Sequence, residues 1–180
     1  MVENLVERIR QKDQRAMNQL YKMYIEELSS VCYRYVPSKN DAKDVLQNSL
    51  VRIFIAIPAI DYRNEESLRA WMIKVVVNEA LSFLRGRKKQ LFIEQDPVAI
   101  QISDDEEPQA EKISSDELHR LISELPDGYR TVINLYVFEG YPHKKIAAML
   151  GITESTSASQ LYYAKRELAK RINELIDSKR

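Results

Sequence analysis

The amino-acid sequence predicts an all-α protein made of two small helical domains joined by an acidic, flexible linker. Apolar residues recur every three or four positions, the helical spacing, on both sides of a strongly acidic strip. Glycine is scarce, with four residues in 180, which disfavours loop-rich β architectures. The 44% apolar and 30% charged shares are ordinary for a soluble protein. No apolar run approaches the ~20 residues that a membrane span needs, so we expect no membrane insertion.

The formal net charge is zero, but the charges are unevenly distributed along the chain. Residues 1–90 hold 16 bases and 11 acids, residues 91–117 hold one base and nine acids, and residues 118–180 hold ten bases and seven acids. The acidic strip contains prolines and clustered like charges without a helical period, which is typical of a linker. We therefore predict a first domain at 1–90, a linker at 91–115 and a second domain at 116–180.

Helical spacing predicts three long helices in the first domain. One ends before Pro37, Ser38 is placed to cap the next, and the third runs from about Ser67 to Lys89. The apolar residues expected to form the buried stripes of these helices are, in chain order, Leu20, Met23, Tyr24 and Leu28; Leu46, Leu50, Ile53 and Ile57; and Leu68, Trp71, Met72 and Val75.

The second domain is predicted to end in a helix-turn-helix. A helix in SSDELHRLISEL is followed by a turn at PDGY and a short apolar helix in RTVINLYVF that ends near Gly140. In the helix-turn-helix, Gly151 permits the sharp turn and Thr153 can cap the second helix. The inward-facing residues of its first helix are predicted to be Ile146, Ala147 and Leu150.

The reactive side chains argue against an enzyme. Cys32 is the single cysteine, so no intrachain disulfide is possible, and we expect a protein of the reducing cytoplasm. His119 and His143 lie far apart in the sequence and form no metal motif. Because no nucleophile–base pair or phosphate-binding loop is present either, we predict no catalytic residue, metal, cofactor or small-molecule substrate.

The second helix of the helix-turn-helix carries few charges for a helix that binds DNA. Residues 151–162 contain one acid, Glu154, and no base, although affinity for DNA comes largely from cations that contact phosphates. Short hydroxyl and amide side chains can still hydrogen-bond to bases and phosphates. The predicted members of this weak, polar reading surface are Thr153, Ser155, Thr156, Ser157, Ser159, Gln160 and Lys165.

Three segments, in this order, resemble the extracytoplasmic-function (ECF) sigma factors, small bacterial initiation factors of the sigma-70 family. DAKDVLQNSLVRIF is similar to the polymerase-docking helix of sigma region two, and LRAWMIKVVVNEALSFLRGRKK to the helix that melts the promoter. LPDGYRTVINLYVFEGYPHKKIAAMLGITESTSASQLYYAKREL is similar to region four, which reads the upstream promoter element. The resemblance implies a non-catalytic subunit that binds core RNA polymerase and promoter DNA.

The resemblance places promoter melting on the loop before the third helix and on that helix. Unstacked bases stack on aromatic rings, and their phosphates pair with Lys or Arg. Residues with this chemistry are Tyr62, Arg63, Asn64, Arg69, Lys74, Asn78, Arg85, Arg87, Lys88 and Lys89. By resemblance, Asn78 and residues 62–64 contact the non-template strand. The alternative is a solvated helix face, and we expect Trp71 to pack in the core.

The resemblance also assigns polymerase docking to the second helix of the first domain. Asp41, Asp44 and Gln47 lie outside its apolar stripe, and in the family this surface meets the clamp helices of the largest polymerase subunit. Lys43 and Asn48 stand where many relatives carry acids. They favour an alternative in which a degenerate sigma factor only binds an anti-sigma factor, a partner that the family leads us to expect.

A free-standing helix-turn-helix regulator is the second alternative. Such a protein needs a strongly basic surface or dimer symmetry to hold DNA unaided, and this reading helix has little of either. If the first domain is anchored on polymerase, a short linker gives the second an effective concentration of about millimolar. Weak readout is then enough for an initiation factor, which is the function that we predict.

Overall fold

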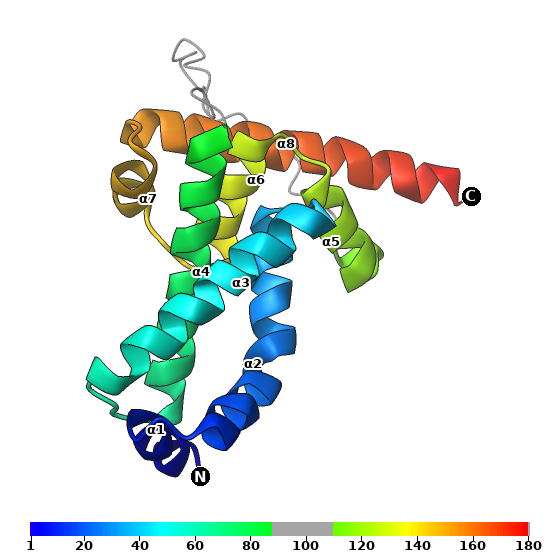
Figure 1. Ribbon diagram of the computed structural model, residues 1–180. Coiled ribbons are helices and arrows are strands. Elements are labelled where there is room, and N and C mark those ends of the chain that lie inside the picture. Colours follow the sequence, from blue (N-terminus) through cyan, green and yellow to red (C-terminus); the bar gives the residue numbers. More distant parts are fainter. Residues whose placement is uncertain (88–109, 180) are drawn as a thin grey trace. The chain divides into compact units, whose positions relative to one another are not determined.

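The computed structural model describes residues 1–87 and 110–179, and within these ranges every regular element is a helix (Figure 1). The predicted all-α class is confirmed. The chain divides into two compact units, unit 1 (Met1–Gly86) and unit 2 (Arg87–Arg180). Most of the predicted linker falls outside the described residues, and the domain boundaries given above stay predictions.

Unit 1 opens with a short amphipathic helix joined to a long one. Helix α1 (Val2–Arg10) buries its apolar side chains against α2 (Gln14–Tyr35). Asp13 fixes the junction, because its Oδ1 accepts hydrogen bonds from the backbone amides of Arg15 and Ala16 at 2.8 and 3.2 Å. Its Oδ2 lies 2.9 Å from Nε of Arg8. This hydrogen bond is the first cause of the lowered pKa of Asp13, followed by the Ala16 amide.

The next two helices complete unit 1. Helix α3 (Lys39–Ala56) is capped by Ser38, as predicted, and continues into the 3-10 helix η1 (Ile57–Ala59). Helix α4 (Glu65–Arg87) begins two residues earlier than the sequence pattern predicts. The side chain of Asn64 explains this start, because its Oδ1 accepts a hydrogen bond from the Ser67 amide at 2.8 Å.

The buried face of α3 differs from the predicted stripe. Ile53 and Ile57 are buried as expected, but Leu46 and Leu50 are only half-buried. The remaining buried residues of the α3 face are Ala42, Val45 and Ser49. Small side chains on this face let α3 approach α2 closely, and Sγ of Cys32 donates to the carbonyl oxygen of Ala42 at 3.4 Å. Side-chain size at the helix contact, rather than apolarity alone, sets the rotation of α3.

The predicted buried stripes of α2 and α4 were also partly wrong. Met23 on α2 is 37% exposed, whereas its neighbours Leu20 and Leu28 are buried. On α4, Trp71 and Val75 are half-buried. The residues that α4 buries are Leu68, Met72, Val76, Val77, Ala80, Leu81 and Leu84. The apolar face of α4 is thus wider than the predicted stripe and is centred one residue further along.

The described residues of unit 2 form the 3-10 helix η2 (Ala110–Lys112) and five further helical elements. These are α5 (Ser115–Ser123), α6 (Asp127–Ile133), the π-helix η3 (Asn134–Phe138), α7 (His143–Leu150) and α8 (Glu154–Ser178). The predicted turn at PDGY is instead the start of α6, because Pro126 occupies the cap position and Asp127 the first turn. A capping box between Ser114 and Glu117 begins α5.

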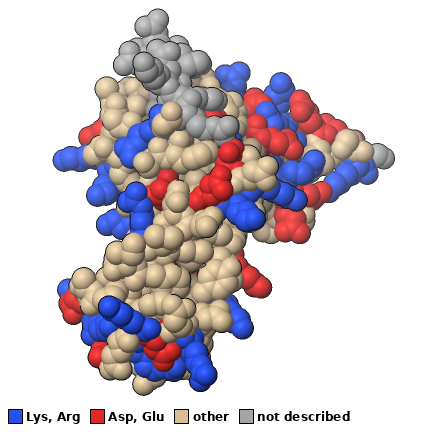
Figure 2. Space-filling view, viewed as in Figure 1, with Lys and Arg blue, Asp and Glu red and all other residues tan. Residues whose placement is uncertain are grey.

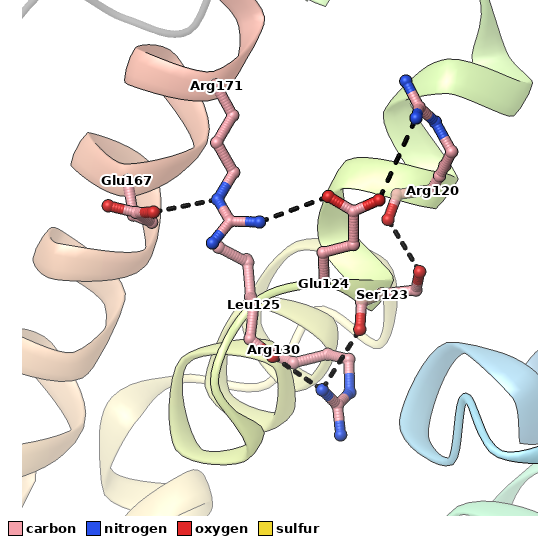
Figure 3. Close-up of polar contacts among 7 residues, drawn as sticks. All are labelled: Arg120, Ser123, Glu124, Leu125, Arg130, Glu167 and Arg171. Carbon is pink, nitrogen blue, oxygen red and sulfur yellow. Dashed lines mark hydrogen bonds and ion pairs between the residues drawn. The ribbon is translucent and has the colours of Figure 1, made fainter.

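Polar contacts hold α8 along α5 (Figure 3). The Arg171 guanidinium lies 2.8 Å from Oε1 of Glu167 on its own helix and 3.3 Å from Oε2 of Glu124 at the end of α5. At the other end of α5, Nζ of Lys179 lies 2.5 Å from Oε1 of Glu117. This bond and the Ser114 amide lower the pKa of Glu117 to about 2. The ion pairs thus join the C-terminal half of α8 to both ends of α5.

Candidate nucleic-acid interface

Unit 1 has a cavity of about 290 Å³ where the loop before α4 meets its first two turns. This volume is close to the lower end, ~300 Å³, of typical ligand pockets. The cavity is lined by Ile60, Asp61, Tyr62, Arg63, Ser67, Leu68 and Trp71. Trp71, expected in the core, is a half-buried wall of this cavity. The sequence signal for it was its position one turn after the polar loop.

Contacts with α2 fix the first turns of α4 beneath the cavity. Oη of Tyr24 donates to Oε1 of Glu65 at 3.2 Å, and burial, with the charge of Glu65, raises the pKa of Tyr24 to about 12. The guanidinium of Arg69 bonds to both carboxylate oxygens of Glu27, with Nε at 2.9 Å from Oε2. Arg69, predicted to contact DNA, therefore has an intramolecular partner here; its contact with DNA stays a prediction.

One face of α4 carries several of the predicted melting residues. Ser67, Trp71, Lys74, Asn78 and Arg85 are spaced by three, four or seven residues, which places them on the same side of the helix. Lys74, Asn78 and Arg85 are exposed. The face therefore leads from the cavity along α4 with a ring, an amide and cations.

The other predicted melting residues are distributed as follows. In the loop, Arg63 and Asn64 are exposed and Tyr62 is half-buried, and Nε of Arg63 lies 3.5 Å from Oδ2 of Asp61. Lys88, Lys89 and the side chain of Arg87 lie outside the described residues.

The exposed face of α3 combines acidic and apolar side chains. Asp44 and Gln47 are exposed, and Asp41 is half-buried. Val51 and Ile55, which the sequence reading did not select, are 53% and 74% exposed and lie seven and eleven residues after Asp44. In the sequence they could have been recognised as two apolar residues that lie outside the predicted buried stripe of this helix. In Figure 2 the surface over the middle of α3 is largely uncharged, whereas charged side chains gather near α1.

The helix-turn-helix of unit 2 is formed by α7 and α8. Gly151 has a φ of 69°, the left-handed conformation that the sharp turn requires, and Thr153 caps α8 by accepting a hydrogen bond from the Thr156 amide at 3.0 Å. Both predictions are confirmed. Ile146, Ala147 and Leu150 are buried, as expected.

Two members of the predicted reading surface are corrected. Ser157 is 0% exposed and Gln160 6%, so neither side chain lies on the surface that faces solvent. Both continue the inward stripe of α8 backwards from Leu161, Ala164 and Leu168 at helical spacing. The sequence already indicated this burial, because positions 157 and 160 lie on the same face of the helix as the apolar residues Leu161, Ala164 and Leu168.

The remaining members of the reading surface lie at or near solvent. Thr153, Ser155 and Lys165 are exposed, and Thr156 and Ser159 are half-buried. Ser159 donates through Oγ to the Ser155 carbonyl oxygen at 3.0 Å, a bond within its own helix. Exposed Lys144 and Lys145 precede the turn on α7, where Figure 2 shows cationic side chains.

His143 joins the two helices from inside the motif. Its Nδ1 lies 2.9 Å from Oγ of Ser157, and its ring stacks on Tyr136 with centroids 4.7 Å apart. Burial lowers the pKa of His143, opposed by the charge of Glu154. The buried Ser157 hydroxyl thus links α7 to α8.

Within residues 1–87 and 110–179, no helix has the length and apolar character needed to cross a membrane. No group of three His, Cys, Asp or Glu side chains in these same residues is placed to hold a metal ion.

Comparison with known proteins identifies the family. The family described as Sigma-70 region 2 matches residues 20–90, and Sigma-70, region 4 matches residues 115–168. The ECF RNA polymerase sigma-E factor of Salmonella typhimurium is 30% identical, with 96% of this chain and 94% of the relative covered. That of Haemophilus influenzae is 29% identical, with 96% and 95% covered.

A solved structure supports the same fold. The sigma factor RpoE of Bartonella quintana, determined in complex with the anti-sigma factor NepR, has a TM-score of 0.51 and 19% identity, covering 87% of this chain and 96% of that one. The resemblance predicted from the three sequence segments is confirmed. The chain belongs to the sigma-70 family as an ECF sigma factor, a class of transcription initiation factors.

Proposed function

We propose that this chain carries core RNA polymerase to promoters by three surfaces and catalyses no reaction itself. The observation that carries the proposal is the face of α4 that leads from the cavity through Trp71, Lys74, Asn78 and Arg85. An aromatic-walled cavity followed by an amide and cations suits an unstacked base and the strand that follows it. The strand would be the non-template strand of the melted promoter.

The cavity would receive one unstacked base. Trp71 and Tyr62 supply rings in its wall, and Asp61 and Arg63 supply polar groups. Flipping a base costs on the order of a few kcal/mol, which a fitted pocket offsets. Because Asn64 caps α4, its Oδ1 is occupied by the Ser67 amide, and its amide NH₂ is the group left for a strand contact.

The α3 face would dock on core polymerase. Asp44 and Gln47 lie beside the exposed apolar side chains of Val51 and Ile55. Apolar side chains surrounded by polar groups are typical of a protein-binding surface. Lys43 and Asn48 are exposed on the same helix, so their replacement by acids tests whether they weaken docking.

The helix-turn-helix would read the upstream promoter element. The exposed residues of α8 supply hydroxyl groups, and Lys144, Lys145 and Lys165 supply the cations. The N-terminus of α8 points backbone amides at any phosphate placed there. Affinity would remain modest without polymerase, since the tether to the docked unit replaces intrinsic affinity.

We also propose a cytoplasmic protein that is regulated by an anti-sigma factor. Support for this partner comes from the complex of RpoE with NepR, a sigma factor of the same fold. We propose no membrane insertion and no small-molecule substrate.

In-vitro transcription tests the proposal. Core polymerase is incubated with a library of promoter fragments, with and without the protein. Transcripts with defined start sites that require the protein are the expected result. Core binding without transcripts would favour a factor that only sequesters an anti-sigma partner. Tight duplex binding without polymerase would favour a free-standing regulator.

A second arm of this experiment tests the α4 face. Asn78→Ala should slow opening of duplex promoters, because the amide contact to the melted strand is lost, and opening should recover on templates with a mismatched bubble. Asn48→Ala on α3 is the matched control and should leave opening unchanged once core is saturated. Equal effects of the two variants would overturn the role of Asn78.

A further inference from the structure

The loop that lines the cavity is hydrogen-bonded to the first helix of the chain, α1. Nη2 of Arg10, on the last turn of α1, donates to the carbonyl oxygen of Ile60 at 2.8 Å. Ile60 is itself a lining residue and directly precedes Asp61 and Tyr62. The bond joins residues 50 positions apart in the sequence.

Helix α1 is a rigid support for this bond. Val2, Leu5, Val6 and Ile9 are between 0% and 2% exposed, and α1 packs on η1, the element that leads into the loop. Arg10 is oriented by a second contact, because its Nη1 lies 3.1 Å from Oε2 of Glu7. A packed helix with an oriented guanidinium holds the carbonyl in one direction.

Tyr62, in the middle of the loop, is half-buried. Burial raises the pKa of Tyr62, and the charges of Glu3 on α1 and Glu65 on α4 add to this effect. At the far end of the loop, Asn64 is fixed by its cap on α4. The loop is therefore anchored at Ile60 by α1 and at Asn64 by α4, and the side chains between these anchors line the cavity.

We propose that α1 is a positioning element for promoter opening, and that Arg10, through the carbonyl of Ile60, sets the loop in the conformation that receives the unstacked base. This inference rests on the function proposed for the cavity. Arg10 does not contact the base. It reduces the number of conformations of the free loop, so that binding the base costs less conformational entropy.

Three variants separate this role from loss of charge or of fold. Arg10→Met keeps the aliphatic stem and removes the donors, and Arg10→Lys keeps one cationic donor. Glu7→Gln removes the charge of the ion pair, but its amide oxygen can still accept from Nη1 of Arg10, so the orientation of Arg10 and the bond to Ile60 are kept. Arg15→Met is the control, because it removes the same charge as Arg10→Met. Arg15 is exposed at the start of α2, and its bond to Asp13 is made by the backbone amide, which the substitution leaves in place.

The measurement is the rate of promoter opening by holoenzyme, on a fragment selected by the wild-type protein, at saturating core polymerase. Arg10→Met should open the duplex roughly 3- to 10-fold more slowly, the range expected when a charge-assisted hydrogen bond of partly exposed groups is lost. Arg10→Lys should recover part of the rate. Glu7→Gln and Arg15→Met should open at the wild-type rate, and all variants should bind core equally.

Removing single non-template bases provides a readout that a general folding defect would not change. On the fragment whose missing base slows the wild type most, Arg10→Met should add no further slowing, because the loop has no base to receive. Equal rates for Arg10→Met and Arg15→Met on the intact duplex, or the same extra slowing on every abasic fragment, would overturn the inference. If wild type opened no promoter, the proposed function itself would fail, and the positioning role with it.

Discussion

Arg130 donates through Nη1 to the carbonyl oxygen of Leu125 at 2.7 Å, from a side chain that is only 4% exposed (Figure 3). The same nitrogen lies 3.3 Å from the Ser123 carbonyl oxygen, and Nη2 lies 2.6 Å from Oδ1 of Asp127. A single buried guanidinium thus closes the connection between α5 and α6. The connection matters because α6 and α8 pack together.

Replacing Arg130 by Met should destabilise unit 2 by about 3 kcal/mol, because the half-buried carboxylate of Asp127 and two carbonyl groups each lose a hydrogen-bond donor. Denaturant unfolding monitored by circular dichroism gives the free energy. Arg120→Met is the control, since the Arg120–Glu124 pair spans 4.0 Å between exposed side chains, and its loss should cost less than ~1 kcal/mol. A similar small cost for Arg130→Met would show that the connection is held by packing alone.

Gly151→Ala should destabilise the helix-turn-helix by about 1–2 kcal/mol, the cost of a left-handed backbone for a residue with a Cβ. Space is open around the position that the Cβ would take, so the cost is conformational rather than steric. Gly151→Asn should therefore recover part of the loss, since Asn tolerates this region. Thermal unfolding measures both, and Gly86→Ala on α4, where φ is not positive, should not destabilise. Equal effects at the two glycines would contradict this explanation.

Thr153 combines a cap with a place on the proposed DNA surface, and two substitutions separate these roles. Thr153→Ala should cost about 1 kcal/mol in stability because the Thr156 amide loses its acceptor. Thr153→Asp should keep the cap and the stability, but its charge should repel phosphate and reduce transcription by the holoenzyme. Thermal unfolding and transcription from a selected promoter are compared, with Thr153→Ser as control. If Thr153→Asp supported transcription at the wild-type level, no DNA phosphate would lie at the N-terminus of α8.

His143 should make unit 2 less stable in mild acid. Its pKa in the folded state lies below the ordinary 6.5, chiefly because of burial. As the pH falls below about 6.5, the unfolded chain takes up the proton first, so the unfolded state is favoured. The stability is fully present above this pH and is lost as the pH falls towards the folded pKa. Thermal unfolding between about pH 7.5 and 5.5 measures the slope.

Two variants separate the contribution of His143 to the pH dependence of stability from the contribution of the carboxylates. His143→Gln should flatten the decline of Tm in this pH range, whereas His119→Gln, at an exposed position on α5, should keep the wild-type slope. Parallel slopes for His143→Gln and the wild type would assign the pH dependence to other groups.

Cys32 should resist alkylation in the native state. Its side chain is 0% exposed, and burial raises the pKa of the thiol to about 11. A shift of this size leaves roughly 100-fold less thiolate at about pH 8 than an ordinary cysteine has. Iodoacetamide labelling followed by mass spectrometry should be slow in buffer and fast in urea, and absent in Cys32→Ala. Equally fast labelling in both solvents would mean that unit 1 opens readily.

The sequence by itself determined the helical class, the family and the features that depend on neighbours along the chain. Ser38 and Thr153 cap their helices, and Gly151 turns between two of them. Each of these depends on backbone groups within a few residues, so that residue type and spacing are enough to predict it.

The tertiary structure decided which side of each helix is buried and which side chains meet across the chain. It placed Trp71 in a cavity wall, turned Ser157 and Gln160 inward, and moved the buried face of α3 away from Leu46 and Leu50. Helical periodicity fixes the relative positions of residues on a helix but not the direction of its neighbours.

The contacts of Arg69 and Arg10 show the same division. Arg69 meets a residue 42 positions away, and Arg10 one that is 50 positions away. The sequence marks both as cations on helices. Their partners follow from the packing of α1, α2 and α4, because separated segments come together only where their side-chain volumes and charges fit.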